Sequence, residues 1–294
     1  MALITNTQFR KSMSRRKLKG RIFYGLCLLS IFIALSMLAM LLYNVLSQGL
    51  TRLSWDFLSS FPSRFPERAG IQAALLGSIY VVGIAGFLTF TLGVGTAIYL
   101  EEYSEKKWYA RIIQINIANL AGVPSIVYGI LGLEIFVRMM ELGKSVLAGG
   151  LTLALLILPI VIIAAQEAIR AVPPSLREGG FALGATRWQV VWTLVLPYSF
   201  PGILTGVILA VSRALGETAP LLVMGALTFV PFSPDGPMSP FSVLPIQIFN
   251  WVSRPKEEFH VAAAAGIIVL LVLLLSMNAV AVVLRNRFQN RMEG

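Results

Sequence analysis

Two charged residues, Arg213 and Glu217, lie four positions apart in a stretch that is otherwise apolar. A charge at the centre of a membrane costs about 2.5–3.5 kcal/mol on insertion scales, so such residues usually face a cavity, a partner or an ion path. Three interpretations are open. The two side chains neutralise each other at i, i+4 spacing, Arg213 reaches the outer surface, or both residues line a substrate pathway.

The composition places this pair in a membrane protein. Of the 294 residues, 56% are hydrophobic and 13% are charged, and the mean hydropathy is +0.78; a soluble domain has about 25% charged residues. A helix needs about 20 apolar residues to cross a bilayer. Six runs are long enough, and they predict an all-α polytopic protein with six transmembrane helices: Ile22–Leu46, Gly70–Leu100, Ile112–Leu133, Ser145–Gln166, Leu194 to about Phe232, and Val261–Leu284.

The distribution of Lys and Arg predicts the orientation of these spans. Sixteen of them fall in the two tails and the loops near Lys106 and Arg177, against seven in the three opposite loops. The positive-inside rule then places both termini in the cytoplasm. We interpret the net charge of +10 as orienting and lipid-contacting, and expect no nucleic-acid partner.

Four regions follow from these runs. We expect a basic cytoplasmic tail at 1–21, a first transmembrane helix with an outer loop at 22–69, a transmembrane domain at 70–284 and a cytoplasmic tail at 285–294.

No catalytic or metal-binding constellation stands out. The single Cys27 lacks a disulfide partner, and the single His260 has no ligand cluster at metal spacing. Gly143-Lys144-Ser145 matches the end of a phosphate-binding loop, but Arg138 occupies the position of its first glycine. We therefore expect that this chain has no catalytic residue, binds no metal and no cofactor, and is not an enzyme.

The largest predicted cytoplasmic loop, Glu167–Gly202, contains a short helix between two spans. Pro173 and Pro174 end the incoming helix. Ser175 and Glu178 have the spacing of a capping box that starts a new helix. We expect Gly184 to end that helix and Pro197 to mark the start of the next span.

The residues Glu178, Gly184, Leu194, Leu196 and Pro197 have the spacing of the EAA loop, and the segment resembles that loop in the membrane permeases of binding-protein-dependent ABC importers. In that family the loop forms a coupling helix that fits a cleft on a cytoplasmic ATPase. The resemblance implies a set of ATPase-coupling residues: Glu178, Gly184, Ala185, Arg187 and Pro197. Gly179 and Gly180 stand where the family usually has alanines.

Four segments narrow the resemblance: Asn119–Leu133, Ala182–Val191, Pro201–Leu222 and Leu244–Ala265 are similar to PstA-type permeases of phosphate-specific ABC importers. This implies the type I ABC importer permease fold in a bacterial cytoplasmic (inner) membrane. It also implies a PstC-type second permease, two ATPase subunits that bind ATP and Mg²⁺, and an extracytoplasmic phosphate-binding protein.

The resemblance also favours the pathway interpretation of the charge pair. A planar guanidinium binds phosphate oxygens in bidentate fashion, and Glu217 would pair with Arg213 when no substrate is present. The alternatives are an ABC permease for another oxyanion or solute, and a non-transporting membrane scaffold or phosphate-sensing regulator.

Helix geometry predicts where the pair points. On an ideal helix both charges lie within about 20° of the direction of Gly206. Small residues at Gly202, Gly206 and Ala210 allow a second helix to approach closely, so we expect this side, with its charges, to point inward. Gly216 and Pro220 should break the helix, and an outer loop should follow at Pro231–Pro245.

Overall fold

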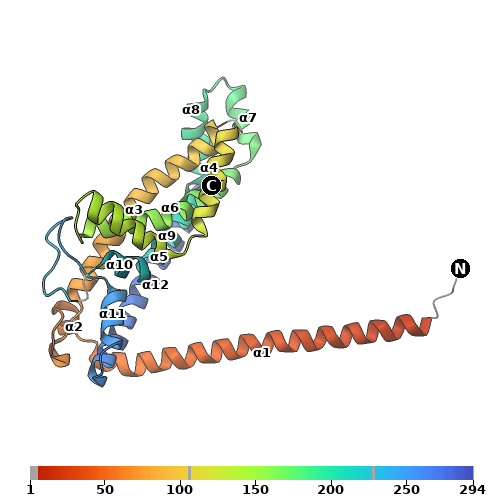
Figure 1. Ribbon diagram of the computed structural model, residues 1–294. Helices are drawn as coiled ribbons and strands as arrows, with labels where there is room; N and C mark the ends of the chain where they lie inside the picture. The colour runs from red at the N-terminus through yellow and green to blue at the C-terminus, as the bar shows by residue number, and fades with distance from the viewer. Residues whose placement is uncertain (1–5, 105–106, 227–228, 294) are drawn as a thin grey trace.

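The computed structural model describes residues 6–104, 107–226 and 229–293, and these residues are almost entirely helical (Figure 1). The predicted all-α class is confirmed, since the β pairing of the described residues is limited to an isolated bridge between Ser145 and Pro240. Four long helices form the bundle: α3 (Gln72–Ile98), α6 (Val146–Arg170), α9 (Leu196–Leu215) and α12 (Glu257–Glu293).

The remaining elements lie at the two ends of this bundle or beside it (Figure 1). They are α1 (Asn6–Arg52), α2 (Trp55–Ser59), η1 (Pro66–Arg68), η2 (Tyr99–Tyr103), α4 (Trp108–Ala121), α5 (Ser125–Gly132), η3 (Leu133–Met139), α7 (Pro174–Ala182), α8 (Arg187–Val190), η4 (Val191–Val195), α10 (Ala219–Met224) and α11 (Leu244–Val252). The elements η2, η3 and η4 are π-helical, whereas η1 is a 3₁₀ turn.

Within the described residues, five helices are long and apolar enough to cross a membrane, and a bent pair supplies a sixth candidate. The five are Lys19–Arg52, Gln72–Tyr103, Val146–Arg170, Arg187–Leu215 and Glu257–Arg287. They correspond to five of the six predicted spans.

The third predicted span, Ile112–Leu133, is not one straight helix. The helix Trp108–Ala121 and the helical segment Ser125–Met139 meet at an angle of 103°. Pro124 lies at the break and precedes α5 as its N-cap. A proline disfavours the helical conformation of the residue before it, which explains the interruption of this apolar run.

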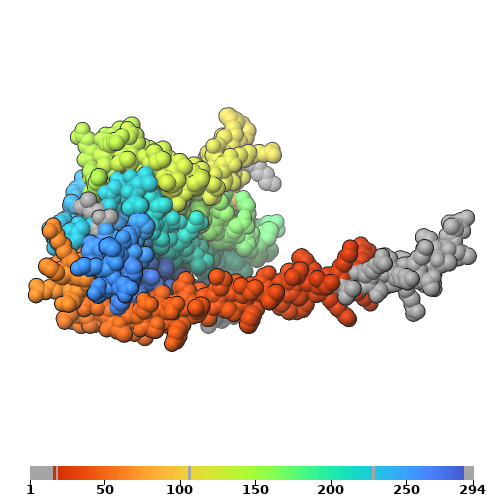
Figure 2. Space-filling model, turned by 60° about the horizontal axis from the view of Figure 1, so that its bottom comes forward, coloured from red at the N-terminus to blue at the C-terminus, as the bar shows by residue number. Residues whose placement is uncertain are grey.

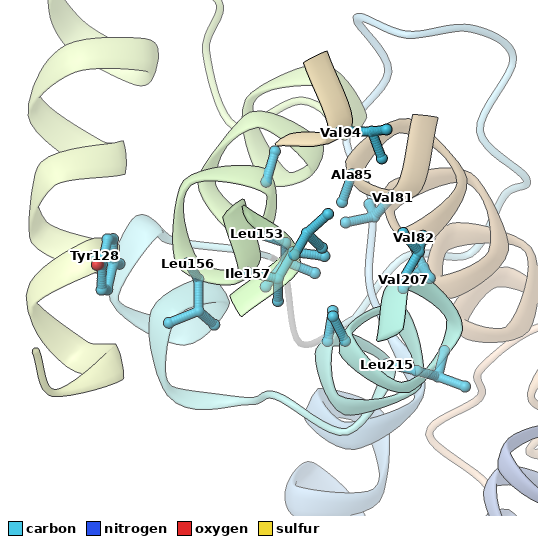
Figure 3. Packing of buried hydrophobic residues seen from close by; sticks show 14 of the residues in the cluster. Val81, Val82, Ala85, Val94, Tyr128, Leu153, Leu156, Ile157, Val207 and Leu215 are labelled. Carbon is cyan, nitrogen blue, oxygen red and sulfur yellow. The ribbon is translucent and has the colours of Figure 1, made fainter. Parts of the chain in front are cut away.

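The hydrophobic core lies where α3, α6 and α9 meet, with α6 in the middle (Figure 3). Val81 and Ala85 on α3 face Leu153 and Ile157 on α6, and Val207 on α9 completes this layer. All five side chains are buried. The core therefore holds three candidate spans together by side-chain packing.

Glycines allow the three backbones to approach closely. A Cβ atom added at Gly206 of α9 would lie 2.5 Å from the Cβ of Ala164 on α6, and one at Gly202 would lie 2.9 Å from that of Ala168. On α3, a Cβ added at Gly93 would lie 2.8 Å from a methyl of Val161. The prediction that the small residues of α9 face another helix is confirmed.

Helix α1 leaves the bundle (Figures 1 and 2). None of its most apolar window is buried against the rest of the chain. Its carboxyl-terminal end is tightly packed, because a Cβ added at Gly49 would lie 2.6 Å from Ile268 of α12. The apolar surface of residues 22–46 is consequently available to lipid or to another protein.

The predicted fifth span ends earlier than its apolar run. Helix α9 stops at Leu215 with Gly216 as its C-cap, and Pro220 lies in the first turn of α10. The predicted break at these residues is confirmed. The segment predicted as an outer loop, Pro231–Pro245, then returns over α6, where the carbonyls of Pro237 and Ser239 accept hydrogen bonds from Leu147 and Val146, two amide groups that a helix start leaves without helical partners. The last two residues of this segment already belong to α11.

One detail of the predicted short helix is wrong. Helix α7 begins after Pro173 without a side-chain cap, so Ser175 and Glu178 form no capping box. Proline fixes the backbone of the first turn and makes that cap unnecessary. A capping box is instead formed by Thr186 and Gln189 at the start of α8.

A second difference concerns Pro197. It does not start the span, because α8, η4 and α9 form one helical run from Arg187 to Leu215. The π-helix Val191–Val195 ends two residues before Pro197. Its altered hydrogen-bond pattern accommodates Pro197, which has no N–H group to donate.

We predict that Gly206→Leu destabilises the protein by about 1–3 kcal/mol, because the added side chain separates α9 from α6. The measurement is the thermal unfolding midpoint of the purified protein in detergent. The control is Leu209→Ala on the exposed face of the same helix. An equal midpoint for Gly206→Leu and the parent protein would contradict the close packing of the two helices.

The two glycines of α7 should differ when each is replaced by alanine. Gly179 faces open space, whereas a Cβ added at Gly180 would lie 2.9 Å from both Val190 and Leu194. Gly179→Ala should stabilise α7 by up to about 1 kcal/mol, and Gly180→Ala should lose part of this gain to crowding. Hydrogen exchange of the amides in 174–182 measures the effect. Greater protection by Gly180→Ala than by Gly179→Ala would show that this packing is wrong.

Candidate functional site

The charged pair predicted in the fifth span lies where α9 ends. Arg213 is in the last turn of α9, and Glu217 follows the end of the helix. The Arg213 Nε atom is 3.5 Å from the Glu217 Oε1 atom. A cation in the last turn of a helix also interacts favourably with the helix dipole. The two residues are therefore brought together as a loose pair.

Arg213 is not enclosed by its own chain. Its side chain is 59% exposed and that of Glu217 is 18% exposed. Its neighbours Ser212 and Ala214 are buried, and the Ser212 hydroxyl donates a hydrogen bond to Asn278 of α12 at 3.0 Å. The expectation that both charges point inward thus fails for Arg213 within this chain. The ideal-helix geometry used for Glu217 also fails, because α9 ends at Leu215.

The predicted coupling residues lie together at one end of the bundle, around α7 and α8 (Figure 1). Glu178 is exposed on α7, and Gly184 joins the two helices with a φ of +81°, a conformation that glycine adopts without strain. Ala185 is partly buried against the core, whereas Arg187 and Pro197 are exposed. The five residues lie in one stretch of chain, 178–197, which runs through α7, α8 and η4 to the start of α9.

This end of the chain also exposes large apolar side chains. Leu183, directly after α7, is 90% exposed, and Phe181 is also exposed. Trp188 and Trp192 pack against each other with ring centroids 5.2 Å apart and remain exposed. An exposed apolar cluster of this kind marks a surface for a protein partner or a membrane interface.

A polar network at the same end was not predicted from the sequence. Glu101 and Glu102, in η2 at the end of α3, accept hydrogen bonds from Arg170 of α6 and Arg177 of α7. The only signal in the sequence was the position of two carboxylates directly after an apolar run. No group of three or more His, Cys, Asp or Glu residues that could hold a metal occurs in the described part of the chain.

Comparisons with known proteins identify the family to which this chain belongs. The family described as "Binding-protein-dependent transport system inner membrane component" matches residues 89–290. A Yersinia pestis relative named phosphate transport system permease protein PstA is 34% identical, with 92% of this chain and 92% of the relative covered. A Mycobacterium tuberculosis relative named phosphate transport system permease protein PstA 1 is 32% identical, with 94% of this chain and 92% of the relative covered.

A solved structure shares the fold. A chain in the crystal structure of a bacterial alginate ABC transporter, in complex with an alginate pentasaccharide-bound periplasmic protein, superposes with a TM-score of 0.59 at 16% identity. The match covers 90% of this chain and 95% of that chain. The chain described here belongs to the family of inner-membrane components of binding-protein-dependent transport systems, the permease subunits of ABC importers.

Proposed function

We propose that this chain is the membrane-spanning permease subunit of an ATP-driven importer that carries inorganic phosphate across the bacterial cytoplasmic membrane. The observation that carries the proposal is similarity at 32–34% identity, over more than nine tenths of the chain, to relatives named as phosphate permeases. The bundle of candidate spans and the charge pair at the end of α9 are consistent with this function.

Arg213 and Glu217 are the proposed substrate-pathway residues. Their separation of 3.5 Å exceeds the 2.7–2.9 Å of the pairs Glu101–Arg170 and Glu102–Arg177. Glu217 is therefore the looser partner, and the guanidinium would have N–H groups left to bind an oxyanion. A fork of N–H donors fits two oxygens of phosphate at once. Glu217 would hold Arg213 between transport events and release it when phosphate binds.

The coupling surface is the second part of the proposal. Leu183 and Phe181, with Glu178 beside them on α7, would dock into a cleft on a cytoplasmic ATPase subunit. The resemblance to the EAA loop supports this role, and the exposure of these side chains leaves them available for it. ATP and Mg²⁺ would be bound by the ATPase pair, and this chain would contribute movement without a catalytic residue or cofactor of its own.

The remaining partners follow from the same proposal. A PstC-type permease would pack beside this chain and face Arg213, and an extracytoplasmic phosphate-binding protein would deliver substrate to the end that carries α2 and α11. Both termini would lie in the cytoplasm, because the tails and the loops around Lys107 and Arg177 contain most of the Lys and Arg residues.

Arg213→Ala should reduce ATP-driven phosphate accumulation in vesicles at least tenfold while the complex still assembles, because the anion loses its counter-charge. Glu217→Gln should have a smaller effect. The control pair is Arg138 and Glu134, which is also spaced i, i+4 but is more exposed; Arg138→Ala should leave uptake within twofold of the parent value.

The outcomes separate this function from its rivals. Wild-type uptake by Arg213→Ala would contradict the pathway role. Competition by sulfate or molybdate stronger than by phosphate would identify a permease for another oxyanion. A permease pair that binds no ATPase subunit would indicate a scaffold or phosphate sensor that does not transport.

Leu183→Asp should weaken association with the ATPase at least tenfold, because it places a charge in an apolar contact. The exposed position of Leu183 means that the fold of the permease itself should be preserved. Copurification of the ATPase measures the effect. The control is Met238→Asp, an equally drastic change at an exposed residue of the loop Pro231–Pro245; equal retention of the ATPase by both variants would refute the proposed docking surface.

A further inference from the structure

Two consecutive carboxylates, Glu101 and Glu102, lie in η2, which directly continues α3. They bond to different elements. Glu101 Oε1 accepts hydrogen bonds from Gln166 Nε2 at 2.8 Å and from the Arg170 guanidinium at 2.7 Å. Glu101 Oε2 accepts from Arg170 Nε at 2.9 Å. The bidentate contact with Arg170 ties the end of α3 to the end of α6.

Glu102 bonds to the coupling helix. Its Oε1 atom accepts from Arg177 Nε at 3.1 Å and from an Arg177 terminal nitrogen at 2.9 Å. The same guanidinium donates to the carbonyl of Ile169 at 2.9 Å and to that of Val172 at 2.7 Å. Arg177 therefore joins three segments: its own helix α7, the end of α6 with its following turn, and the end of α3.

The backbone of η2 explains how neighbouring residues reach both partners. Residues Tyr99–Tyr103 form a π-helix, whose turn is wider than that of an α-helix. More residues per turn means a smaller angle between successive side chains, so Glu101 and Glu102 both face the α6 and α7 side. Short π-helical segments occur frequently at functional sites.

Helix α7 is short and buries little of its own surface. It has nine residues, of which only Gly180 is buried, and isolated helices of this length are marginal in water. Helix α7 packs mainly against α8 and η4, and its Leu176 packs, partly buried, against the hydrophobic core. The Arg177 side chain is only 22% exposed and that of Glu102 11% exposed, so their contact is partly shielded from solvent, where ion pairs are screened less by salt.

We propose that Glu102 and Arg177 are a positioning pair that fixes the coupling helix to the ends of α3 and α6, while Glu101 and Arg170 hold those two ends together. A push of the ATPase on α7 then moves α3 and α6 as one body. The inference rests on the proposed coupling role of α7. It adds the residues within this chain through which the movement reaches the spans.

The first test is a double-mutant cycle in the complete transporter, with Glu102→Gln, Arg177→Gln and the double variant. Each single change should lower the phosphate transported per ATP hydrolysed at least fivefold, and the double variant should be no worse than Arg177→Gln alone, because the two act through one contact. The control, Glu167→Gln, removes the more exposed partner of Arg170 and should leave the ratio unchanged.

The second test measures position without requiring transport. Spin labels at Gly179→Cys and Leu92→Cys, in a Cys27→Ser background that removes the only native cysteine, report the distance between α7 and α3. Both label sites are exposed. The distance distribution in the assembled complex should be narrow, should broaden in Arg177→Gln and Glu102→Gln, and should stay narrow in Glu167→Gln.

The outcomes distinguish the positioning pair from the proposed function. Unchanged distance distributions in Arg177→Gln and Glu102→Gln, or additive effects of the two changes on the transport ratio, would overturn the inference. Broadened distributions in these two variants of a complex that does not carry phosphate would support the positioning pair. The same result would refute phosphate as the substrate.

Discussion

The close packing of α6 against α3 and α9 is the constraint on which the rest of the structure depends. Helices in a membrane gain little from hydrophobic burial against one another, because the lipid is equally apolar, so contact depends on how closely their surfaces fit. Gly93 on α3 and Gly206 on α9 provide that fit, since each faces a side chain of α6 at a distance that leaves no room for a Cβ atom. These three helices therefore act as a frame to which shorter elements attach.

Both ends of this frame are completed by polar contacts. At one end, loop carbonyls satisfy the first amides of α6. At the other, Glu101 and Glu102 connect α3 with α6 and α7. Helix α12 packs against the end of α9 that carries Arg213, since the neighbouring Ser212 is bonded to Asn278 of α12. In the proposed function, these contacts would connect a partner that hydrolyses ATP with a charge that faces a passing anion.

Much of this architecture could be predicted from local sequence features. Long apolar runs predicted six spans, of which five are continuous helices long enough to cross a membrane and the third is a bent pair. The line of small residues on α9 predicted its contact with another helix. Pro124 was the signal for the bend in the third run, but the prediction used only the length of the run and so missed it. The capping box at Ser175 was wrong because Pro173 and Pro174 already fix the start of α7. The contact of Glu102 with Arg177 joins residues 75 positions apart, so spacing could not predict it. The exposure of Arg213 depends on which helices pack around it, and spacing does not give that either.

The central functional claim is that Arg213 presents its guanidinium to a passage between two permeases. An experimental structure of the whole transporter with phosphate bound in the membrane region tests this claim most directly. The account predicts that the guanidinium lines the passage within hydrogen-bond distance of the anion. A structure in which Arg213 contacts lipid or the outer aqueous phase, with phosphate passing elsewhere, would contradict it.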